Sequence, residues 1–366
     1  MTAPNPLADL TTFDVRTPSA CSTVIIGTGA VARLPELIAP ASLPARRFIV
    51  SNPTVWRLHG PVLARTSREH AILIPDGERY KNLATTGRIY EALIRGAADR
   101  STTIVAAGGG VVGDVAGFAA ATYLRGVPIV QVPTTLLAQV DSAIGGKVGV
   151  NHALGKNLIG AFHQPSVVVI DPDLLKTLPR REFRAGLYEV IKYGVIASRD
   201  LFDRVRASMR ALFDRDAAAL APVITESCRI KASVVEQDER ESGLRRMLNF
   251  GHTIGHALEA VTKYKRFRHG EAVAYGMLAA AHLGVKRGTL LEADRAALAT
   301  LIGSMGPLPA VSDLEPDPIL EAVSHDKKVL GGQLHFVLPA GIGAVTTVTD
   351  ISKAELKDAV AAIRKV

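Results

Sequence analysis

Residues 103–114, TIVAAGGGVVGD, hold the pattern that decides the fold of the first half of the chain. The β-rich run 103–107 predicts a buried strand, the glycines after it predict a tight turn, and residues 113–124 are typical of a helix. The glycines match G-x-G-x-x-G, and backbone amides at the start of a helix can hold a pyrophosphate. The acidic residue expected about 20 positions further on is missing near Pro128. Purely structural glycines therefore explain the turn about as well.

The same alternation extends outward from this segment. Strands are expected at residues 23–26, 47–50, 71–74, 129–132 and 167–170, and a further helix at 84–95. From about Arg180 onward the sequence predicts helices at 182–196, 201–214, 220–235, 253–261 and 273–286, a β-like patch at 334–339 and 344–348, and a last helix from Ser352 with Glu355 completing a capping box. We expect an α/β, Rossmann-like nucleotide-binding domain over residues 1–179 and a mainly α-helical domain over residues 180–366.

Composition narrows the class of protein. The chain has 366 residues, of which 48% are hydrophobic and 21% charged, as in a globular protein with two cores. Neither a signal peptide nor a membrane span is predicted, so we expect a cytoplasmic protein. Cys21 and Cys228 form no disulfide or zinc-knuckle pattern. The net charge of +8 is explained either by a basic surface that favours solubility or by an anionic partner. We do not expect nucleic-acid binding, because the sequence has no basic run interleaved with aromatic residues.

Two further stretches suit an anionic ligand. Residues 75–81, PDGERYK, follow a predicted strand, so they form either a nucleotide-contacting loop or a solvated turn that starts a helix. Lys147 and Lys156 are each preceded by glycine, with hydroxyls and amides nearby, as in an anion-binding nest. Asp114 lies near the start of its helix, where capping is the simpler role.

The candidate metal residues are histidines. His252 and His256 are four residues apart and share one helical face, while His269 follows and Glu189 lies upstream. Thr253 stands where a zincin H-E-x-x-H motif has glutamate, so that protease class is excluded. Three N or O ligands with an open position are typical of a catalytic zinc site. A single helical histidine is more often a core residue, but three between positions 252 and 269, in a chain with ten, favour a site.

Together these motifs resemble the 3-dehydroquinate synthases over nearly the whole chain. The resemblance is carried by GGGVVGDVAGFAAATYLRG (108–126), QVPTTLLAQVDSAIGGKVGVNH (131–152), LGKNLIGAFHQP (154–165), EVIKYG (189–194), LNFGHTIGHALE (248–259), RHGEAVAYGM (268–277) and HDKKVLGG (325–332). One departure is Tyr188, in GLYE (186–189), where the family usually has Gly-Met-Ala-Glu. We expect the Tyr188 side chain to point away from the metal.

The resemblance implies a role for each site residue. The implied metal ligands are Glu189, His252 and His269, whereas His256, which spacing alone favours as a ligand, is assigned to the substrate. The implied NAD contacts are Asp76, Glu78, Lys81, Gly109, Gly110, Asp114, Thr134, Thr135, Lys147, Lys156 and Thr177. The implied substrate contacts are Asp141, Lys147, Asn157, Lys192, Lys231, Arg245, Asn249, His256 and one of Lys327 or Lys328. The family forms homodimers, and Arg125 is expected to reach the site of a partner subunit.

The implied reaction belongs to the shikimate pathway of aromatic amino acid biosynthesis. It converts 3-deoxy-D-arabino-heptulosonate 7-phosphate to 3-dehydroquinate and phosphate, and it requires NAD and one divalent ion, zinc or cobalt. The implied steps are transient oxidation at C5, phosphate elimination, re-reduction, ring opening and an intramolecular aldol, so the enzyme is a lyase without net redox. Three alternatives remain: another sugar-phosphate cyclase, a metal-dependent polyol dehydrogenase, and a cofactor-binding module without catalysis.

Overall fold

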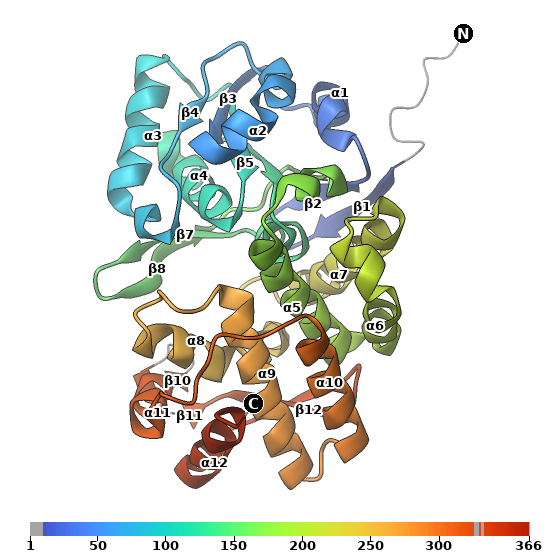
Figure 1. The fold of residues 1–366 in the computed structure, drawn as a ribbon. Coiled ribbons are helices and arrows are strands. Elements are labelled where there is room, and N and C mark those ends of the chain that lie inside the picture. The colour runs from blue at the N-terminus through green and yellow to red at the C-terminus, as the bar shows by residue number, and fades with distance from the viewer. Residues whose placement is uncertain (1–9, 326–328, 331–332, 366) are drawn as a thin grey trace. The chain divides into compact units, whose positions relative to one another are not determined.

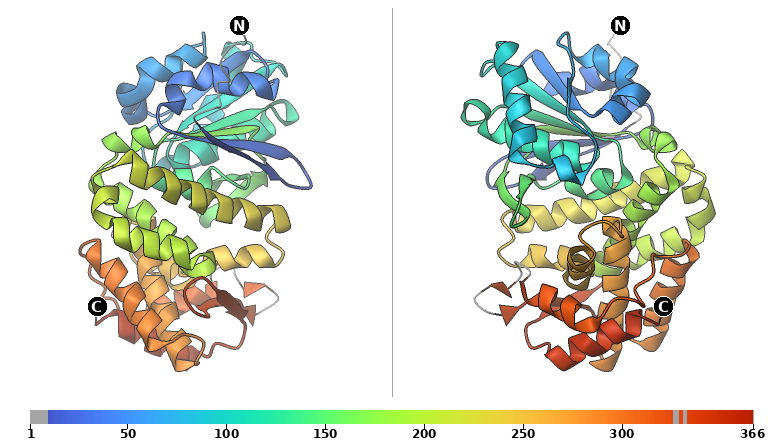
Figure 2. Two further views of the ribbon diagram at one scale, coloured as in Figure 1. Left: turned by 90° about the vertical axis from the view of Figure 1, so that its right-hand side faces the viewer. Right: turned by 60° about the vertical axis from the view of Figure 1, so that its left-hand side comes forward.

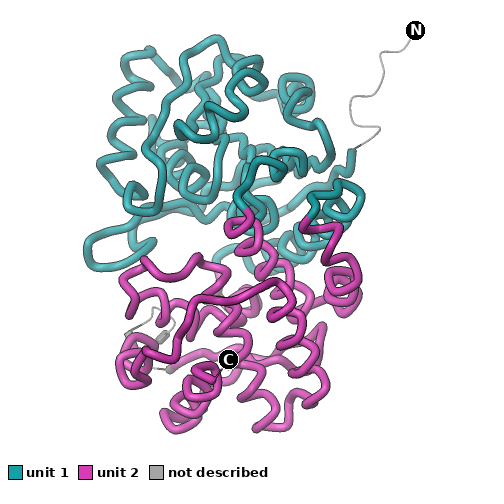
Figure 3. Tube along the Cα trace, in the orientation of Figure 1, with its two compact units in different colours: residues 1–179, 214–240 teal, residues 180–213, 241–366 magenta. Residues whose placement is uncertain are grey.

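The computed structural model describes residues 10–325, 329–330 and 333–365 (Figure 1). The chain divides into two compact units, of which the first contains Met1–Pro179 and Asp214–Arg240 and the second contains Arg180–Phe213 and Glu241–Val366 (Figure 3). The expected division after residue 179 is one of the points at which the chain passes between units. The segment Asp214–Arg240, which sequence analysis placed with the later helices, groups with the first unit.

A seven-stranded sheet forms the centre of the first unit. Its strands, in the spatial order β1-β2-β9-β6-β5-β3-β4, are β1 (Thr11–Arg16), β2 (Cys21–Ile26), β9 (Val167–Ile170), β6 (Ile129–Pro133), β5 (Thr102–Gly108), β3 (Arg46–Ser51) and β4 (Ile72–Leu73). All pairings are parallel except that of β1 with β2. The six expected strands are confirmed. Sequence analysis did not predict β1 or the separate hairpin of β7 (Lys147–His152) and β8 (Gly155–Phe162).

Both faces of this sheet are covered, as its hydrophobic strands require. On β5, Ile104 and Ala106 belong to one core cluster, and Val105 and Ala107 belong to the other. The first cluster includes side chains of α3 (Leu83–Arg95) and α4 (Gly110–Thr122), and the second includes those of α1 (Leu34–Ile38) and α2 (Pro53–Leu63) (Figure 2). A further helix, α7 (Ala217–Gln237), packs against β1. The fold is therefore the Rossmann-like arrangement that the sequence predicts.

The second unit is mainly helical, as expected. Its helices are α5 (Arg180–Ala197), α6 (Arg199–Phe213), α8 (His252–Val261), α9 (His269–Lys286), α10 (Glu292–Ser304), α11 (Pro316–His325) and α12 (Lys353–Ile363). Short hairpins pair β10 (Val329–Leu330) with β11 (Gln333–Leu334) and β12 (Phe336–Pro339) with β13 (Val345–Val348). Sequence analysis did not predict α10 and α11. The largely buried α9 is central, because it contacts α5, α8, α10, α12 and β12.

Glycines allow the helices around α9 to approach closely. A Cβ atom on Gly276 of α9 would lie 1.7 Å from the carbonyl oxygen of Gly251, the left-handed residue (φ 79°) before α8. A Cβ atom on Gly270, in the first turn of α9, would lie 2.0 Å from the carbonyl oxygen of Ala185 on α5. Only glycine permits such backbone contacts, and only glycine readily adopts the backbone of Gly251. The starts of α8 and α9 are therefore held close to α5.

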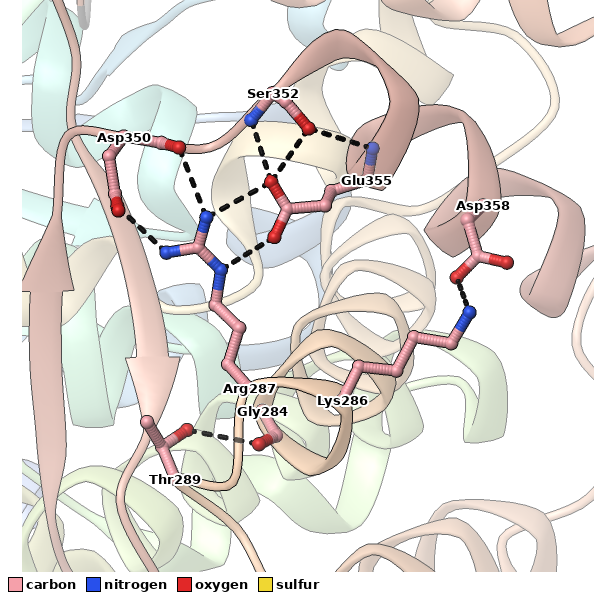
Figure 4. A network of polar contacts seen from close by, with 8 residues as sticks. All are labelled: Gly284, Lys286, Arg287, Thr289, Asp350, Ser352, Glu355 and Asp358. Atoms are coloured by element: carbon pink, nitrogen blue, oxygen red, sulfur yellow. Dashed lines mark hydrogen bonds and ion pairs between the residues drawn. The ribbon is translucent and has the colours of Figure 1, made fainter.

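The other end of α9 is joined to α12 by polar contacts (Figure 4). Arg287, directly after α9, donates to Glu355 Oε1 from Nε at 2.6 Å and to Asp350 Oδ1 from Nη1 at 2.7 Å. Ser352 and Glu355 form the expected capping box, with Ser352 N donating to Glu355 Oε2 at 2.8 Å and Glu355 N donating to Ser352 Oγ at 3.2 Å. The start of α12 is thus fixed both by its cap and by Arg287.

None of the described helices is long and apolar enough to cross a membrane.

Candidate functional site

The glycine turn after β5 serves both packing and ligand access. A Cβ atom on Gly108 would lie 2.5 Å from Val112, and one on Gly109 would lie 3.0 Å from Thr135 Cγ2. Gly108 therefore needs glycine for packing alone, whereas a side chain at Gly109 would make a tight contact with Thr135. Gly109 is the N-cap of α4, and no side chain caps that end of the helix. Amides at such a helix start can bind a phosphate group, so the structural and ligand-binding explanations of this turn hold together.

Asp114 faces a lysine rather than capping its helix. Lys81 Nζ lies 2.5 Å from Asp114 Oδ2 and donates to Asn157 Oδ1 at 2.5 Å. Burial works against the charged ammonium, but attraction to Asp114 and Glu78 outweighs it and raises the pKa of Lys81. Lys81 therefore stays cationic in a buried position, where its ammonium can bind a phosphate or a ribose.

The β7–β8 hairpin brings the remaining polar groups of this cluster together. Asn151 Nδ2 donates to Glu78 Oε1 at 2.8 Å, and Asn157 N donates to Asn151 Oδ1 at 2.9 Å. Asn157 has a left-handed backbone (φ 52°), a conformation that asparagine tolerates better than most residues. Glu78, Lys81, Asp114 and Asn157, separated in sequence, thus form one network. Sequence analysis did not single out Asn151, which links two of them.

Other expected NAD residues lie elsewhere in the first unit. Thr135 adjoins Gly109 and accepts a hydrogen bond from Ala138 N at 3.2 Å, and Thr134 is buried beside it in the chain. Asp76 accepts from Thr54 Oγ1 at 2.9 Å. The Thr177 hydroxyl lies 3.0 Å from Nε2 of His59, a residue that sequence analysis did not select. The remaining members are placed by their elements: Gly110 begins α4, Lys147 begins β7 and Lys156 lies in β8.

Two expected substrate residues form a pair in the first unit. Lys231 Nζ on α7 lies 2.5 Å from Asp141 Oδ1 and donates to Asp141 O at 2.6 Å. Asp141 lies in a one-turn π-helical segment, Ala138–Ser142, against which α7 packs. The position of Lys231 thus explains why Asp214–Arg240 belongs with the sheet. Arg125, expected to serve a partner subunit, follows Leu124 in a turn where both residues have positive φ, 50° and 71°.

The expected metal residues converge within the second unit. Glu189 Oε1, on α5, lies 3.6 Å from His252 Nε2 and 3.5 Å from His269 Nε2, on the first residues of α8 and α9. Ligands at about 2.0–2.2 Å from a tetrahedral ion are themselves about 3.3–3.6 Å apart. The spacing of these three side chains therefore fits one divalent ion.

The far side of each imidazole also suits a metal ligand. His252 Nδ1 lies 3.1 Å from the carbonyl oxygen of Phe250, and His269 Nδ1 lies 3.4 Å from Glu259 Oε2. An acceptor at Nδ1 favours the tautomer whose Nε2 lone pair is available for a metal. Glu259 is one turn beyond His256 on the same face of α8, a spacing that could have identified it from the sequence.

His256 also lies in this group. One ring nitrogen from each of His252, His256 and His269 lies within 4.8 Å of the others, and the His256 ring centroid is 5.3 Å from that of His252 and 5.8 Å from that of His269. The geometry is therefore compatible with His256 as a metal ligand, as its spacing from His252 suggests, and also with the set Glu189, His252 and His269 that the family implies. The assignment of His256 to the substrate stays a prediction.

Buried carboxylates attract positive charge around the proposed metal residues. Glu189 is fully buried, and the ammonium of Lys192 lies 2.5 Å from its Oε2. Burial opposes a positive charge on His269, but the carboxylates of Glu259 and Glu189 outweigh it and raise the pKa of His269 to about 10. A positive charge is therefore stabilised at this imidazole.

The remaining expected substrate residues in the second unit are partly placed. Arg245 and Asn249 lie in the short 3₁₀ segment Leu244–Asn249, where Arg245 is buried and Asn249 Nδ2 donates to Glu241 Oε1 at 2.8 Å. Lys327 and Lys328 lie outside the described residues. Tyr188, the departure from the family pattern, is fully buried, and burial raises its pKa to about 12 while Arg184 opposes the shift.

Comparisons with known proteins identify the family of the chain. Family models described as 3-dehydroquinate synthase N-terminal and C-terminal match residues 71–185 and 186–329. A 3-dehydroquinate synthase of Pelotomaculum thermopropionicum is 50% identical over 90% of this chain and 91% of the relative. One of Nostoc punctiforme is 48% identical over 93% of this chain and 96% of the relative.

Solved structures share the fold. A 2-epi-5-epi-valiolone synthase of Streptomyces hygroscopicus with bound NAD⁺ and Zn²⁺ matches with a TM-score of 0.86 and 30% identity, over 93% of this chain and 96% of that chain. A 2-deoxy-scyllo-inosose synthase complexed with carbaglucose-6-phosphate, NAD⁺ and Co²⁺ matches with a TM-score of 0.84 and 28% identity, over 96% and 99%. Since two family models cover most of the chain and curated relatives reach 50% identity over nine-tenths of it, the chain belongs to the 3-dehydroquinate synthase family.

Proposed function

We propose that this protein converts 3-deoxy-D-arabino-heptulosonate 7-phosphate to 3-dehydroquinate and phosphate, as a phosphorus–oxygen lyase of the shikimate pathway that uses NAD and one divalent ion, zinc or cobalt. Identity to named 3-dehydroquinate synthases reaches 50%, against 30% and 28% for the two solved cyclases that act on other sugars. The dehydroquinate branch is therefore favoured over another sugar-phosphate cyclase.

The observation that carries the proposal is the convergence of Glu189, His252 and His269. Their atoms are spaced as the ligands of one tetrahedral ion, and both imidazoles have acceptors at Nδ1. In this role Glu189, His252 and His269 would hold the ion. When bound, the ion would supply a Lewis acid for a substrate hydroxyl, and NAD would supply a hydride acceptor.

Within the first unit, the chain supplies nucleotide contacts. The uncapped start of α4 at Gly109 and Gly110 binds the pyrophosphate through backbone amides. Lys81, held cationic by Asp114, adds a charge to the same cluster, and Glu78 offers a carboxylate to a ribose. A Cβ atom at position 109 would lie 3.0 Å from Thr135 Cγ2, so glycine keeps this turn free of a crowded side chain.

The cationic residues of the proposed site bind the carboxylate and the phosphate of the substrate. Lys231 and Asp141 form a fixed pair in the first unit, while Lys192 and Arg245 are buried in the second. A buried cation whose position is already set loses little side-chain freedom when it binds an anion. Lys147 belongs to the same proposed set. Among the proposed substrate residues that the structure describes, none stands out as a strong general base, so we propose that the leaving phosphate takes the proton itself.

The test is a product assay on the purified protein. The heptulosonate phosphate is supplied with catalytic NAD and either Zn²⁺ or Co²⁺, and phosphate, dehydroquinate and NADH are measured. We expect one phosphate per dehydroquinate and no accumulation of NADH. Steady NADH formation from an alcohol would instead indicate a polyol dehydrogenase. Turnover of a different sugar phosphate alone would indicate another cyclase. A lack of turnover with the heptulosonate phosphate, with other sugar phosphates and with alcohols would support a cofactor-binding module without catalysis.

We further propose that the protein is a cytoplasmic homodimer. Support comes from the family resemblance and from Arg125, which lies in a turn of two positive-φ residues, a strained conformation typical of functional loops. Light scattering on the purified chain should give twice its mass of 38.8 kDa, whereas a monomeric mass would contradict the assembly. Cell fractionation tests the location.

A further inference from the structure

Glu271, which has no assigned role in the reaction, joins α5 to the start of α9. Its side chain is fully buried and accepts four hydrogen bonds. Arg181 donates to Oε1 from Nε at 2.8 Å and to Oε2 from Nη2 at 2.7 Å, and Arg184 Nη2 donates to Oε1 at 3.0 Å. The backbone amide of Arg268 donates to Oε2 at 2.8 Å. Both carboxylate oxygens are therefore fully engaged.

These contacts link two of the three helices that carry proposed metal ligands. Arg181 and Arg184 lie on α5, the helix of Glu189, whereas Glu271 lies in the first turn of α9, which begins with His269. A second ion pair joins the same elements, because Arg268 Nε lies 2.6 Å from Glu182 Oε1. The Arg181–Glu271 contact uses two parallel hydrogen bonds, a geometry that fixes orientation as well as distance.

Backbone packing at the same place leaves little freedom. Gly270, between His269 and Glu271, touches the carbonyl of Ala185, which follows Arg184 on α5. The glycine contact sets how closely α9 can approach α5, and the ion pairs hold it there. His269 directly precedes Gly270, and its Nε2 lies 3.5 Å from Glu189 Oε1.

We propose that Glu271 is a positioning residue, which holds His269 at the ligand distance from Glu189 through its ion pairs with Arg181 and Arg184. This inference rests on the proposed function, because it takes Glu189 and His269 to be metal ligands. A metal tolerates displacements of only about 0.2 Å in its ligand distances, so a loosened start of α9 weakens binding even when the fold persists. Loss of a partner that hydrogen-bonds a ligand directly typically changes metal affinity by about 10- to 100-fold, and we take that range as the expected effect of Glu271, which acts on His269 through the start of α9.

The competing explanation is that Glu271 contributes only to stability. The opposite end of α9 offers a matched control, since Arg287 contacts Glu355 through the same two-point geometry, with Nε to Oε1 at 2.6 Å and Nη2 to Oε2 at 3.0 Å (Figure 4). That pair joins α9 to α12 rather than to α5. Loss of the Glu355 pair should lower stability without moving His269.

The experiment compares Glu271→Gln with Glu355→Gln in the full chain. Zn²⁺ affinity is measured by competition with a chromophoric chelator, the visible absorption spectrum is recorded for the Co²⁺-loaded proteins, and thermal melts are recorded without metal. We expect Glu271→Gln to weaken Zn²⁺ binding by about 10- to 100-fold and to alter the Co²⁺ spectrum. Glu355→Gln should lower the melting temperature and leave both metal readouts unchanged.

An unchanged Zn²⁺ affinity and Co²⁺ spectrum in folded Glu271→Gln would overturn the positioning role. If that variant does not fold, Arg181→Lys serves instead, because Arg181 is 46% exposed and lysine keeps the charge while losing the two-point contact. Weaker Zn²⁺ binding in Arg181→Lys supports the proposal, and wild-type affinity contradicts it. If the wild-type protein itself binds no Zn²⁺ or Co²⁺, the metal assignment within the proposed function fails, an outcome distinct from the failure of Glu271 alone.

Discussion

At the scale of single residues, the buried carboxylate of Glu259 is placed to orient the imidazole of His269. Its Oε2 lies 3.4 Å from His269 Nδ1, on the side of the ring opposite Glu189. Replacing it with alanine should free the imidazole to rotate and change tautomer, and should weaken Zn²⁺ binding by about 10- to 100-fold. Chelator competition measures the effect. Glu259→Gln, which keeps an acceptor oxygen, should lose less, so equal losses in the two variants would argue against an orienting contact.

Lys147 gives a residue-scale test of substrate binding. It is exposed at the start of β7, so its replacement by alanine should leave the fold intact. A charge-assisted hydrogen bond to an anion contributes about 1.5–3 kcal/mol, and we expect turnover to fall by at least the corresponding ~10- to 150-fold. Phosphate release and circular dichroism together check this. A near-normal rate in a folded variant would contradict the assignment.

At the scale of elements, the contact between α8 and α9 depends on Gly276. A methyl group there would lie 1.7 Å from the carbonyl oxygen of Gly251, directly before His252. Gly276→Ala should therefore push the helices apart, with a cost in unfolding free energy of about 1–3 kcal/mol or more, and should weaken metal binding at the same time. Chemical denaturation and Zn²⁺ titration test the two effects. Gly303→Ala on α10, where nothing lies within 4 Å of the added carbon, is the control and should leave Zn²⁺ binding unchanged while raising the unfolding free energy by up to about 1 kcal/mol.

The start of α12 provides an element-scale prediction of pH dependence. Hydrogen bonds from Arg287, and then from Ser352, lower the pKa of Glu355 to about 2, below its ordinary value of 4.5. A carboxylate with a depressed folded-state pKa contributes stability above its unfolded pKa, and this contribution is lost as the pH falls from about 4.5 towards 2. Melting temperatures of the wild-type chain should therefore fall more steeply below pH 4.5 than those of Glu355→Gln. Parallel curves would show that the pair contributes nothing measurable.

At the scale of the whole molecule, metal binding should appear as thermal stability. A ligand that binds only the folded state stabilises it by about 2.7 kcal/mol at a concentration one hundred times its dissociation constant. We expect Zn²⁺ or Co²⁺ to raise the melting temperature and a chelator to reverse the shift. Glu189→Gln should abolish the response, since the carboxylate shared by both imidazoles is lost. A metal-induced shift that survives in this variant would place the ion elsewhere.

Features that depend on residues close together in the sequence were predicted correctly, whereas features that depend on residues far apart in the sequence were missed. The strand 102–108 and its glycine turn, and the capping box of Ser352 and Glu355, depend on residues close in sequence, and the structure confirms them. The β7–β8 hairpin was not predicted, because its β8 strand lies largely exposed and its glycines and lysines resemble a loop. The contact between Asn151 and Glu78 was not predicted either, because the two residues are distant in the chain.

The sequence by itself determined the alternation of strands and helices, the change to helices after Arg180, and, through its motifs, the family and the candidate ligands. The tertiary structure decided three matters that sequence spacing left open. It placed Lys231 and its helix with the sheet, brought Glu189 to the same point as His252 and His269, and set Glu259 and Glu271 around His269. The periodicity of the sequence indicates which face of a helix is apolar. It does not indicate which helices pack together, because that depends on how closely their backbones can approach one another. Here that approach is set by Gly251, Gly270 and Gly276.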